Sequence, residues 1–246
     1  MLKHQRQFWD MPNRIVLLIG GYGSGKTYIG ALKSLYMSYL NSPVPGMYIS
    51  PSHQLATKTI IVTLKELCER AEIDYTYNQQ RSEFTFHNWG GTIWLGSGDK
   101  PDSLRGPNIG WAVIDEPFIQ KREVFEQMIA RVRHPEAKKS QIFLTGTPEQ
   151  LNWGFTLAND PKLDLGTIQA STLDNPHLPD DYKESLLQAY SEEQIDAYVH
   201  GKFVNLTQGR VYKDFDRDKH VVERPDLKNE GLPIGIGMDF NVDAMS

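Results

Sequence analysis

The stretch "IGGYGSGKT" at residues 19–27 constrains this chain more than any other feature. It contains the complete pattern G-x-x-x-x-G-K-[ST] of a phosphate-binding loop. Glycines let successive backbone N–H groups turn inward around phosphate oxygens, and the helix that follows adds unsatisfied amides. An apolar run precedes the loop and a helical pattern begins at its lysine, which is the context that the motif requires. We therefore predict a nucleotide triphosphate site made by Gly20, Gly21, Tyr22, Gly23, Ser24, Gly25, Lys26 and Thr27.

Short apolar runs alternate with helical patterns along the first 170 residues. Runs typical of buried strands are "RIVLLIG", "GMYIS", "WAVIDE" and "SQIFLTG", and the segment "SEFTFHNWGGTIWLGSG" is typical of a hairpin. Helical spacing follows at 26–40, 53–71 and 124–133. This order predicts an α/β P-loop fold with a mostly parallel sheet covered by helices on both faces.

The texture of the sequence changes near residue 170. We predict an ATPase core over 1–170, and then a small lid-like subdomain and linker over 171–230, where turn-rich sequence surrounds two short helical patterns. Residues 231–246 contain "IGIGMDFNVD", which is typical of a strand.

The carboxylates that should accompany a phosphate loop occur in "WAVIDE" at 111–116. Asp115 ends an apolar strand and is expected to hold Mg²⁺ together with Thr27, while Lys26 reaches the terminal phosphates of ATP. Glu116 is the candidate for polarising the attacking water. A second acid of this kind favours hydrolysis over transfer to an acceptor, since a kinase does not need it.

The segment "TGTP" ends the next apolar strand. Its small hydroxyl residues can sense whether the γ-phosphate is present and pass that information along the chain. A common structural turn is an equally good interpretation of these four residues taken alone. The candidate coupling residues are Thr145, Gly146 and Thr147.

Composition narrows the range of partners. A net charge of −5 and a pI near 5.8 count weakly against permanent binding to nucleic acid, so we expect any DNA contact to be local or transient.

The single cysteine, Cys68, excludes an intrachain disulfide. No apolar run approaches the length of a membrane helix, and no signal peptide precedes the phosphate loop, so we expect a protein that is neither membrane-bound nor secreted.

Taken in order, "HQRQF", the phosphate loop, "LRG" at 104–106, "WAVIDE", "TGTP" and "STLDNPHLP" at 171–179 resemble the large terminase subunit, which packages DNA into tailed-phage and herpesvirus capsids. The resemblance covers essentially the whole chain and implies ATP hydrolysis that moves double-stranded DNA into a procapsid. It also implies a ring of subunits, the portal protein and the small terminase subunit as partners, and a place in the host cell cytoplasm, docked transiently on the procapsid.

The resemblance assigns roles to further residues. Gln5 is similar to the glutamine that contacts the adenine edge, and "TGTP" corresponds to the coupling motif of the family. Arg105 matches an arginine proposed to reach the ATP of a neighbouring subunit; Arg81, Arg122 and Arg131 are alternatives for that role, and a local salt bridge is the alternative role for Arg105. Many terminases have an arginine where this chain has Tyr22, and tyrosine cannot stabilise phosphoryl charge.

Large terminases also carry a nuclease domain of ribonuclease H type. The strand in 231–246 is similar to the first strand of that domain, with Asp239 at the position of a metal-binding aspartate. Because the other acids of a two-metal site are absent, we expect the chain to end inside that domain and nuclease activity only in the full-length protein.

Two other functions remain open. A superfamily 2 helicase shares the upstream glutamine, the phosphate loop and the Asp-Glu pair, but it needs a second core domain, and the residues after "TGTP" lack strand-helix alternation. A nucleotide-gated assembly scaffold would bind ATP without turnover, which the adjacent acids at 115–116 argue against.

Overall fold

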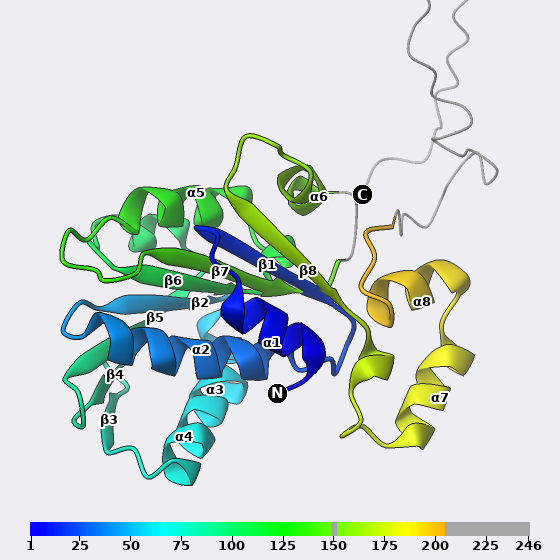
Figure 1. The fold of residues 1–246 in the computed structure, drawn as a ribbon, viewed down its shortest axis with the longest axis horizontal. Helices are drawn as coiled ribbons and strands as arrows, with labels where there is room; N and C mark the ends of the chain where they lie inside the picture. Colours follow the sequence, from blue (N-terminus) through cyan, green and yellow to red (C-terminus); the bar gives the residue numbers. More distant parts are fainter. Residues whose placement is uncertain (149–151, 205–246) are drawn as a thin grey trace, which may run out of the picture. The chain divides into compact units, whose positions relative to one another are not determined.

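The structure is a computed structural model that describes residues 1–148 and 152–204. Its centre is an eight-stranded sheet in the order β3-β4-β5-β2-β6-β7-β1-β8 (Figure 1). The strands are β1 (Ile15–Gly20), β2 (Gly46–Ser50), β3 (Tyr75–Asn78), β4 (Glu83–Phe86), β5 (Gly91–Ser97), β6 (Trp111–Asp115), β7 (Gln141–Gly146) and β8 (Leu165–Ala170). Neighbouring strands from β5 to β8 in this order pair in parallel. The pairs β3–β4 and β4–β5 are antiparallel. The predicted α/β class is confirmed.

Helices cover both faces of this sheet. In Figure 1, α1, α2, α3 and α4 lie on one face, and α5 and α6 lie on the other. The helices are α1 (Lys3–Asp10), α2 (Lys26–Asn41), α3 (His53–Lys58), α4 (Ile60–Arg70), α5 (Arg122–Arg131), α6 (Trp153–Ala158), α7 (Asp180–Ala189) and α8 (Glu192–Tyr198), with short 3₁₀ turns η1 (Pro101–Leu104), η2 (Pro117–Ile119) and η3 (Thr172–Asp174). No helix in the described part of the chain has both the length and the apolar character needed to cross a bilayer.

Strand β1 shows why the sheet needs two covering layers. All six of its residues are buried, and they point alternately to the two faces. Val16 and Leu18 join the core beneath α1, α2 and α4, whereas Ile15, Leu17 and Ile19 join the core beneath α5 and α6. An apolar run without alternation is the expected pattern for a parallel strand buried on both sides.

The register of the sheet brings the predicted site residues to one edge. The phosphate loop follows β1, while Asp115 ends β6 and pairs in register with Thr145 of β7. Parallel strands end at the same edge, so the loop, the acidic pair and "TGTP" all lie at the carboxyl edge of the sheet.

The structure differs from the predicted elements in several places. The predicted helix over 53–71 is two helices, because the backbone breaks at Thr59 (φ −120°, ψ −87°). Strand β8 pairs in parallel with β1 and was not predicted, and neither were α1, α6 and β3. Two helices after residue 170 agree with α7 and α8. The linker beyond residue 204 and the strand in 231–246, including Asp239, lie outside the described residues.

Candidate functional site

The phosphate loop connects β1 to α2 in a conformation that depends on its glycines. Gly25 is the N-cap of α2 and has φ +84°. Because no side chain caps this helix, its first backbone N–H groups have no capping partner. A Cβ atom at Gly25 would lie 2.5 Å from Gln5 Nε2, and one at Gly21 would lie 2.4 Å from the Thr172 hydroxyl. A Cβ atom at Gly21 would also lie 2.4 Å from the backbone carbonyl oxygen of Val199, so packing excludes a side chain there. At Gly25 the positive φ disfavours any other residue.

Lys26 is buried at the start of α2. Its ammonium donates a hydrogen bond to the carbonyl of Gly21 at 2.9 Å. Burial lowers the pKa of Lys26, while the nearby carboxylates of Glu116 and Asp115 oppose this shift. The electrostatic influence of both acids on Lys26 indicates that these three charged groups share one site.

Asp115 is the buried acid at the end of β6, with 4% of its surface exposed. Its carboxylate accepts a hydrogen bond from Thr145 Oγ1 at 2.8 Å. Burial, and then the charge of Glu116, raise the pKa of Asp115 to about 7, against the opposing effects of the Thr145 hydrogen bond and of Lys26. A cation close to this carboxylate would favour its charged form.

Glu116 follows directly and has a left-handed backbone conformation, with φ +46°. This conformation is strained for a residue with a side chain and is often found at functional sites. Its carboxylate accepts a hydrogen bond from the backbone N–H of Thr147 at 2.9 Å, and its own N–H donates to the Thr145 carbonyl at 2.7 Å. The structure thus joins the expected catalytic acid to both threonines of "TGTP".

Gln120 supports this acidic pair and was not identified from the sequence. Its Nε2 donates to the backbone carbonyl of Asp115 at 2.6 Å, and its own backbone carbonyl accepts from Trp153 Nε1 at 3.0 Å. A glutamine four residues beyond the acidic pair gives no sequence signal of this role, because only the turn η2 brings it back to the strand end.

Arg105 forms ion pairs with two acids of its own chain. Its guanidinium pairs with Asp102 at 3.0 Å and with Glu123 at 3.1 Å, and 57% of its side chain is exposed. The local salt bridge, which was the alternative role expected for Arg105, is therefore formed in this structure. A role in a neighbouring subunit's site stays a prediction.

Gln5 lies in α1 and contacts the phosphate loop. Its Nε2 donates to the Gly25 carbonyl at 3.1 Å, and its Oε1 accepts from the N–H of Leu2 at 2.9 Å. Both ends of the amide thus have partners inside the protein. The amide has a second N–H and a second lone pair, so these bonds do not exclude contact with an adenine edge, and that assignment stays a prediction.

Three further residues contact the phosphate loop and were not singled out: His4, Thr172 and Asn175. Thr172 lies in η3 and Asn175 directly follows it. Both belong to "STLDNPHLP", which the sequence indicated only through its resemblance to terminases. Tyr22 stacks its ring on Tyr198 with centroids 4.9 Å apart.

Comparison with known proteins agrees with this geometry. A family model described as "Terminase large subunit, T4likevirus-type, N-terminal" matches residues 17–219. The PBSX phage terminase large subunit of Bacillus subtilis (strain 168) is 26% identical over 249 residues, covering 91% of this chain and 57% of that protein.

Solved structures show the same fold. The large terminase of a thermophilic bacteriophage, determined in complex with ADP, is similar with a TM-score of 0.74 at 19% identity, over 91% of this chain and 59% of that one. The large terminase ATPase domain of Thermus phage P74-26 gives a TM-score of 0.61 at 15% identity, over 81% of this chain and 92% of that one. This chain thus spans less than two thirds of the PBSX protein and of the terminase determined with ADP.

Proposed function

Because the chain belongs to the family of terminase large subunits of the T4-like-virus type, we propose that it is a P-loop ATPase domain whose hydrolysis of ATP moves double-stranded viral DNA into a procapsid. The observation that carries the proposal is the meeting of Lys26, Asp115 and Glu116 at the carboxyl edge of a parallel sheet. A phosphate-binding lysine beside two strand-end acids is the arrangement that P-loop ATPases use.

A cavity of about 540 Å³ next to the phosphate loop provides room for the nucleoside. It is lined by α1, the loop, α2, the end of α4 and the segment after η3, with Gln5, Gly25, Tyr28, Arg70 and His177 among its residues. Its volume is in the range of small-molecule sites. The similar terminase of a thermophilic bacteriophage was determined in complex with ADP, and the same ligand class fits this chain.

The chemistry assigned to the residues follows from their positions. The loop amides and Lys26 bind the β- and γ-phosphates, and Glu116 orients and polarises the attacking water. The hydroxyl of Thr27 and the carboxylate of Asp115 are oxygen ligands of the kind Mg²⁺ takes when it keeps several waters. When bound there, the ion neutralises charge that develops on the phosphoryl oxygens.

We propose that loss of the γ-phosphate is transmitted from the two acids to the "TGTP" segment. Glu116 is hydrogen-bonded to the Thr147 N–H, and Asp115 accepts from Thr145, so both acids are joined to β7. We assign Thr145, Gly146 and Thr147 to coupling, with the core over 1–170 acting on a lid over 171–230. Arg105 is proposed to complete the site of a neighbouring subunit in a ring.

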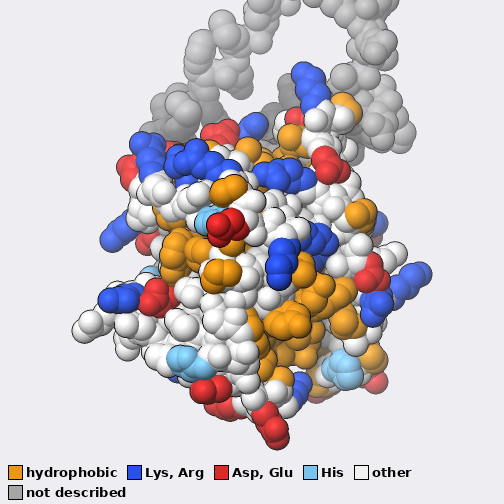
Figure 2. All heavy atoms as spheres, turned by 60° about the vertical axis from the view of Figure 1, so that its left-hand side comes forward, with side chains coloured by type: hydrophobic (Ala, Val, Ile, Leu, Met, Phe, Trp, Pro, Cys, Tyr) orange, Lys and Arg blue, Asp and Glu red, His pale blue; other side chains and the backbone are white. Residues whose placement is uncertain are grey.

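We propose the partners on the ground that the chain belongs to this family. They are double-stranded DNA, the portal protein and the small terminase subunit, encountered in the host cell cytoplasm on a procapsid. The surface supports contact with a polyanion, because Lys and Arg side chains gather over the upper part of the face shown in Figure 2 although the chain is acidic overall. Asp239 is proposed to belong to the first strand of a nuclease domain.

A superfamily 2 helicase and a nucleotide-gated scaffold are the competing functions. A helicase would separate strands of a duplex, whereas a packaging ATPase moves the duplex intact. A scaffold would bind ATP without turnover.

The proposal is tested by measuring phosphate release from ATP by the wild type and by Lys26→Ala. Each full-length protein is measured alone, with duplex DNA, and with DNA and procapsids. We expect turnover that requires Lys26 and rises when DNA and procapsids are both present. Wild-type turnover that neither DNA nor procapsids raise would contradict the packaging function, and binding without turnover would favour the scaffold.

A further inference from the structure

The outward-facing carbonyls of the phosphate loop are held by side chains from two separate segments. On one side, α1 supplies both donors. His4 Nε2 donates to the Ser24 carbonyl at 2.8 Å, and Gln5 Nε2 donates to the Gly25 carbonyl at 3.1 Å. Both donors are at most 5% exposed, so water does not compete effectively for these bonds.

On the other side, the segment after β8 supplies two more donors. Thr172 Oγ1 donates to the Tyr22 carbonyl at 2.7 Å, and Asn175 Nδ2 donates to the Gly23 carbonyl at 2.7 Å. Both side chains are buried, with at most 8% of their surface exposed. Four consecutive carbonyls of the loop, 22–25, thus each accept one side-chain hydrogen bond.

This arrangement fixes the direction of the loop amides. In a planar trans peptide the C=O and the following N–H point in opposite directions. Carbonyls of residues 22–25 held outward therefore turn the N–H groups of residues 23–26 inward, where a phosphate would lie. Among the described residues, only the N–H of Ser24 in this set donates to a backbone carbonyl, that of Gly21 at 3.3 Å.

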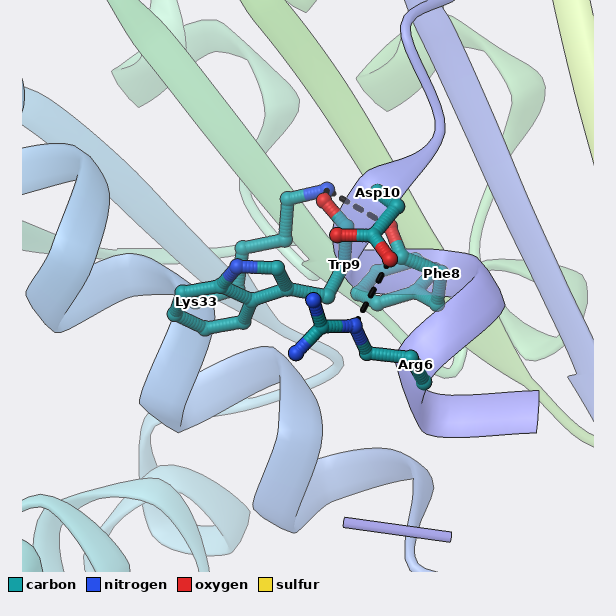
Figure 3. Close-up of polar contacts among 5 residues, drawn as sticks. All are labelled: Arg6, Phe8, Trp9, Asp10 and Lys33. Carbon is teal, nitrogen blue, oxygen red and sulfur yellow. Dashed lines mark hydrogen bonds and ion pairs between the residues drawn. The ribbon is translucent and has the colours of Figure 1, made fainter. Parts of the chain in front are cut away.

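Helix α1 is itself anchored at its far end, as Figure 3 shows. The buried Lys33 of α2 donates from Nζ to the carbonyls of Phe8 at 2.7 Å and Trp9 at 3.1 Å. The same ammonium lies 4.8 Å from the Phe8 ring centroid and 4.3 Å from that of Phe143, within cation–π range. Helix α1 can therefore hold the loop as a fixed element.

The second segment is anchored through β8. Thr172 donates its backbone N–H to the Val199 carbonyl at 2.8 Å, and Ser171 and Asp174 form a capping box around η3. Because β8 pairs with β1 up to Gly20, the segment leaves the sheet beside the loop that it contacts.

We propose that His4, Thr172 and Asn175 are positioning residues for nucleotide binding, which orient the amides of the phosphate loop by holding its carbonyls outward. The proposal rests on the proposed function in that it takes ATP as the ligand. His4 and Thr172 do not line the cavity assigned to the nucleoside, whereas Asn175 does, so the test rests on His4 and Thr172. If they act only on the fold, their loss lowers stability and leaves the affinity of the folded protein unchanged.

The test compares pairs of variants that differ in one donor. Thr172→Val removes the hydroxyl and keeps the shape, whereas Thr172→Ser keeps the hydroxyl. His4→Phe removes the donor, whereas His4→Gln keeps an amide donor. Kd for ATP and ADP, KM, kcat and the urea midpoint of unfolding are measured for each, with Ser185→Ala as a control that removes another hydroxyl-to-carbonyl hydrogen bond, in α7.

We expect Thr172→Val and His4→Phe each to weaken ATP and ADP binding about 3- to 10-fold, the usual effect of one hydrogen bond. KM should rise with little change in kcat, because the amides hold the phosphates equally before and during reaction. Thr172→Ser, His4→Gln and Ser185→Ala should keep wild-type affinity.

Lower urea midpoints with unchanged Kd in the donor-deleted variants would overturn the proposal and leave the ATPase function intact. Should one donor-deleted variant fail to fold, the other provides the same comparison, since His4 and Thr172 hold different carbonyls of the loop. A wild type that binds no ATP would instead refute the proposed function, and this proposal with it.

Discussion

The carboxylate of Glu116 accepts a hydrogen bond from the backbone N–H of Thr147 at 2.9 Å. This bond joins the end of β6 to the end of β7 at the position where water would be activated. The left-handed backbone of Glu116 directs its side chain to that bond at the cost of local strain. A change in the charge or position of this carboxylate therefore alters a hydrogen bond of the "TGTP" segment.

The Glu116–Thr147 bond leads to a prediction that separates binding from turnover. Glu116→Gln keeps an oxygen that can accept from the Thr147 N–H but loses the negative charge that polarises water. We expect kcat to fall about 10²- to 10⁴-fold while the Kd for ATP stays within a few fold of wild type. Single-turnover phosphate release and equilibrium ATP binding measure the two quantities. A variant with normal kcat would remove Glu116 from the catalytic role.

Asp115 leads to a prediction about pH. Its pKa rises from the usual 3.8 to about 7 on folding, mainly because it is buried. Between these values the folded chain retains a proton that the unfolded chain has lost, so stability falls as pH rises through this window. Asp115→Asn removes the titration. We expect the free energy of unfolding of this variant, relative to wild type, to rise by up to about 1.4 kcal/mol per pH unit across this window.

Urea unfolding at pH 5 and pH 7.5, without nucleotide or divalent cations, measures this difference. Asp115→Asn should also lose ATP turnover, which distinguishes a functional acid from a merely buried one. A stability difference that is the same at both pH values would show that Asp115 does not titrate in this range.

Much of the site could be predicted from the sequence because its chemistry is local in the chain. The phosphate loop is continuous, and the acids end an apolar run, so composition and spacing identify them. The rule that parallel strands end at one edge places Asp115 and Thr145 on the same side of the sheet, and the structure adds the hydrogen bond between them.

The remaining features depend on contacts between distant segments. His4 lies 20 residues from Ser24, and Thr172 lies 150 residues from Tyr22. No periodicity in the sequence reports such pairings. Strand β8 was missed because only alternate residues are buried in this edge strand, and the break at Thr59 was missed because the apolar spacing continues across it.

Lys33 leads to a prediction of the opposite sign to that for Asp115. Burial, and then the charge of Lys139, lower the pKa of Lys33 from 10.5 to about 7, while Asp10 opposes them. Above about pH 7 the unfolded chain holds a proton that the folded chain lacks, so wild-type stability rises with pH up to the unfolded pKa. The variant Lys33→Met lacks this titration.

We therefore expect the free energy of unfolding of wild type, relative to Lys33→Met, to rise by up to about 1.4 kcal/mol per pH unit above neutrality. Denaturant unfolding of both proteins at pH 7 and pH 9 provides the measurement, and other groups cancel in the comparison. Parallel pH profiles for the two proteins would show that Lys33 keeps its proton throughout.

Arg105 leads to the last prediction, which distinguishes its two roles. As a brace, it makes exposed ion pairs with Asp102 and Glu123, and such pairs contribute at most about 1 kcal/mol. We therefore expect Arg105→Ala to unfold nearly as wild type does. As a finger, it would act on the ATP of a neighbouring subunit, and its loss would reduce turnover about 10³- to 10⁵-fold in the assembled ring.

Mixing two inactive variants tests whether the arginine acts between subunits. Full-length Arg105→Ala and Glu116→Ala are combined with procapsids and DNA, and ATP turnover is followed as the ratio of the two is varied. A subunit with an intact Glu116 can then receive Arg105 from a neighbour that lacks the acid, so we expect activity to reappear and to peak at an intermediate ratio. If Arg105→Ala alone turns over ATP normally, the ion pairs with Asp102 and Glu123 are its whole role, and the finger must be sought among Arg81, Arg122 and Arg131.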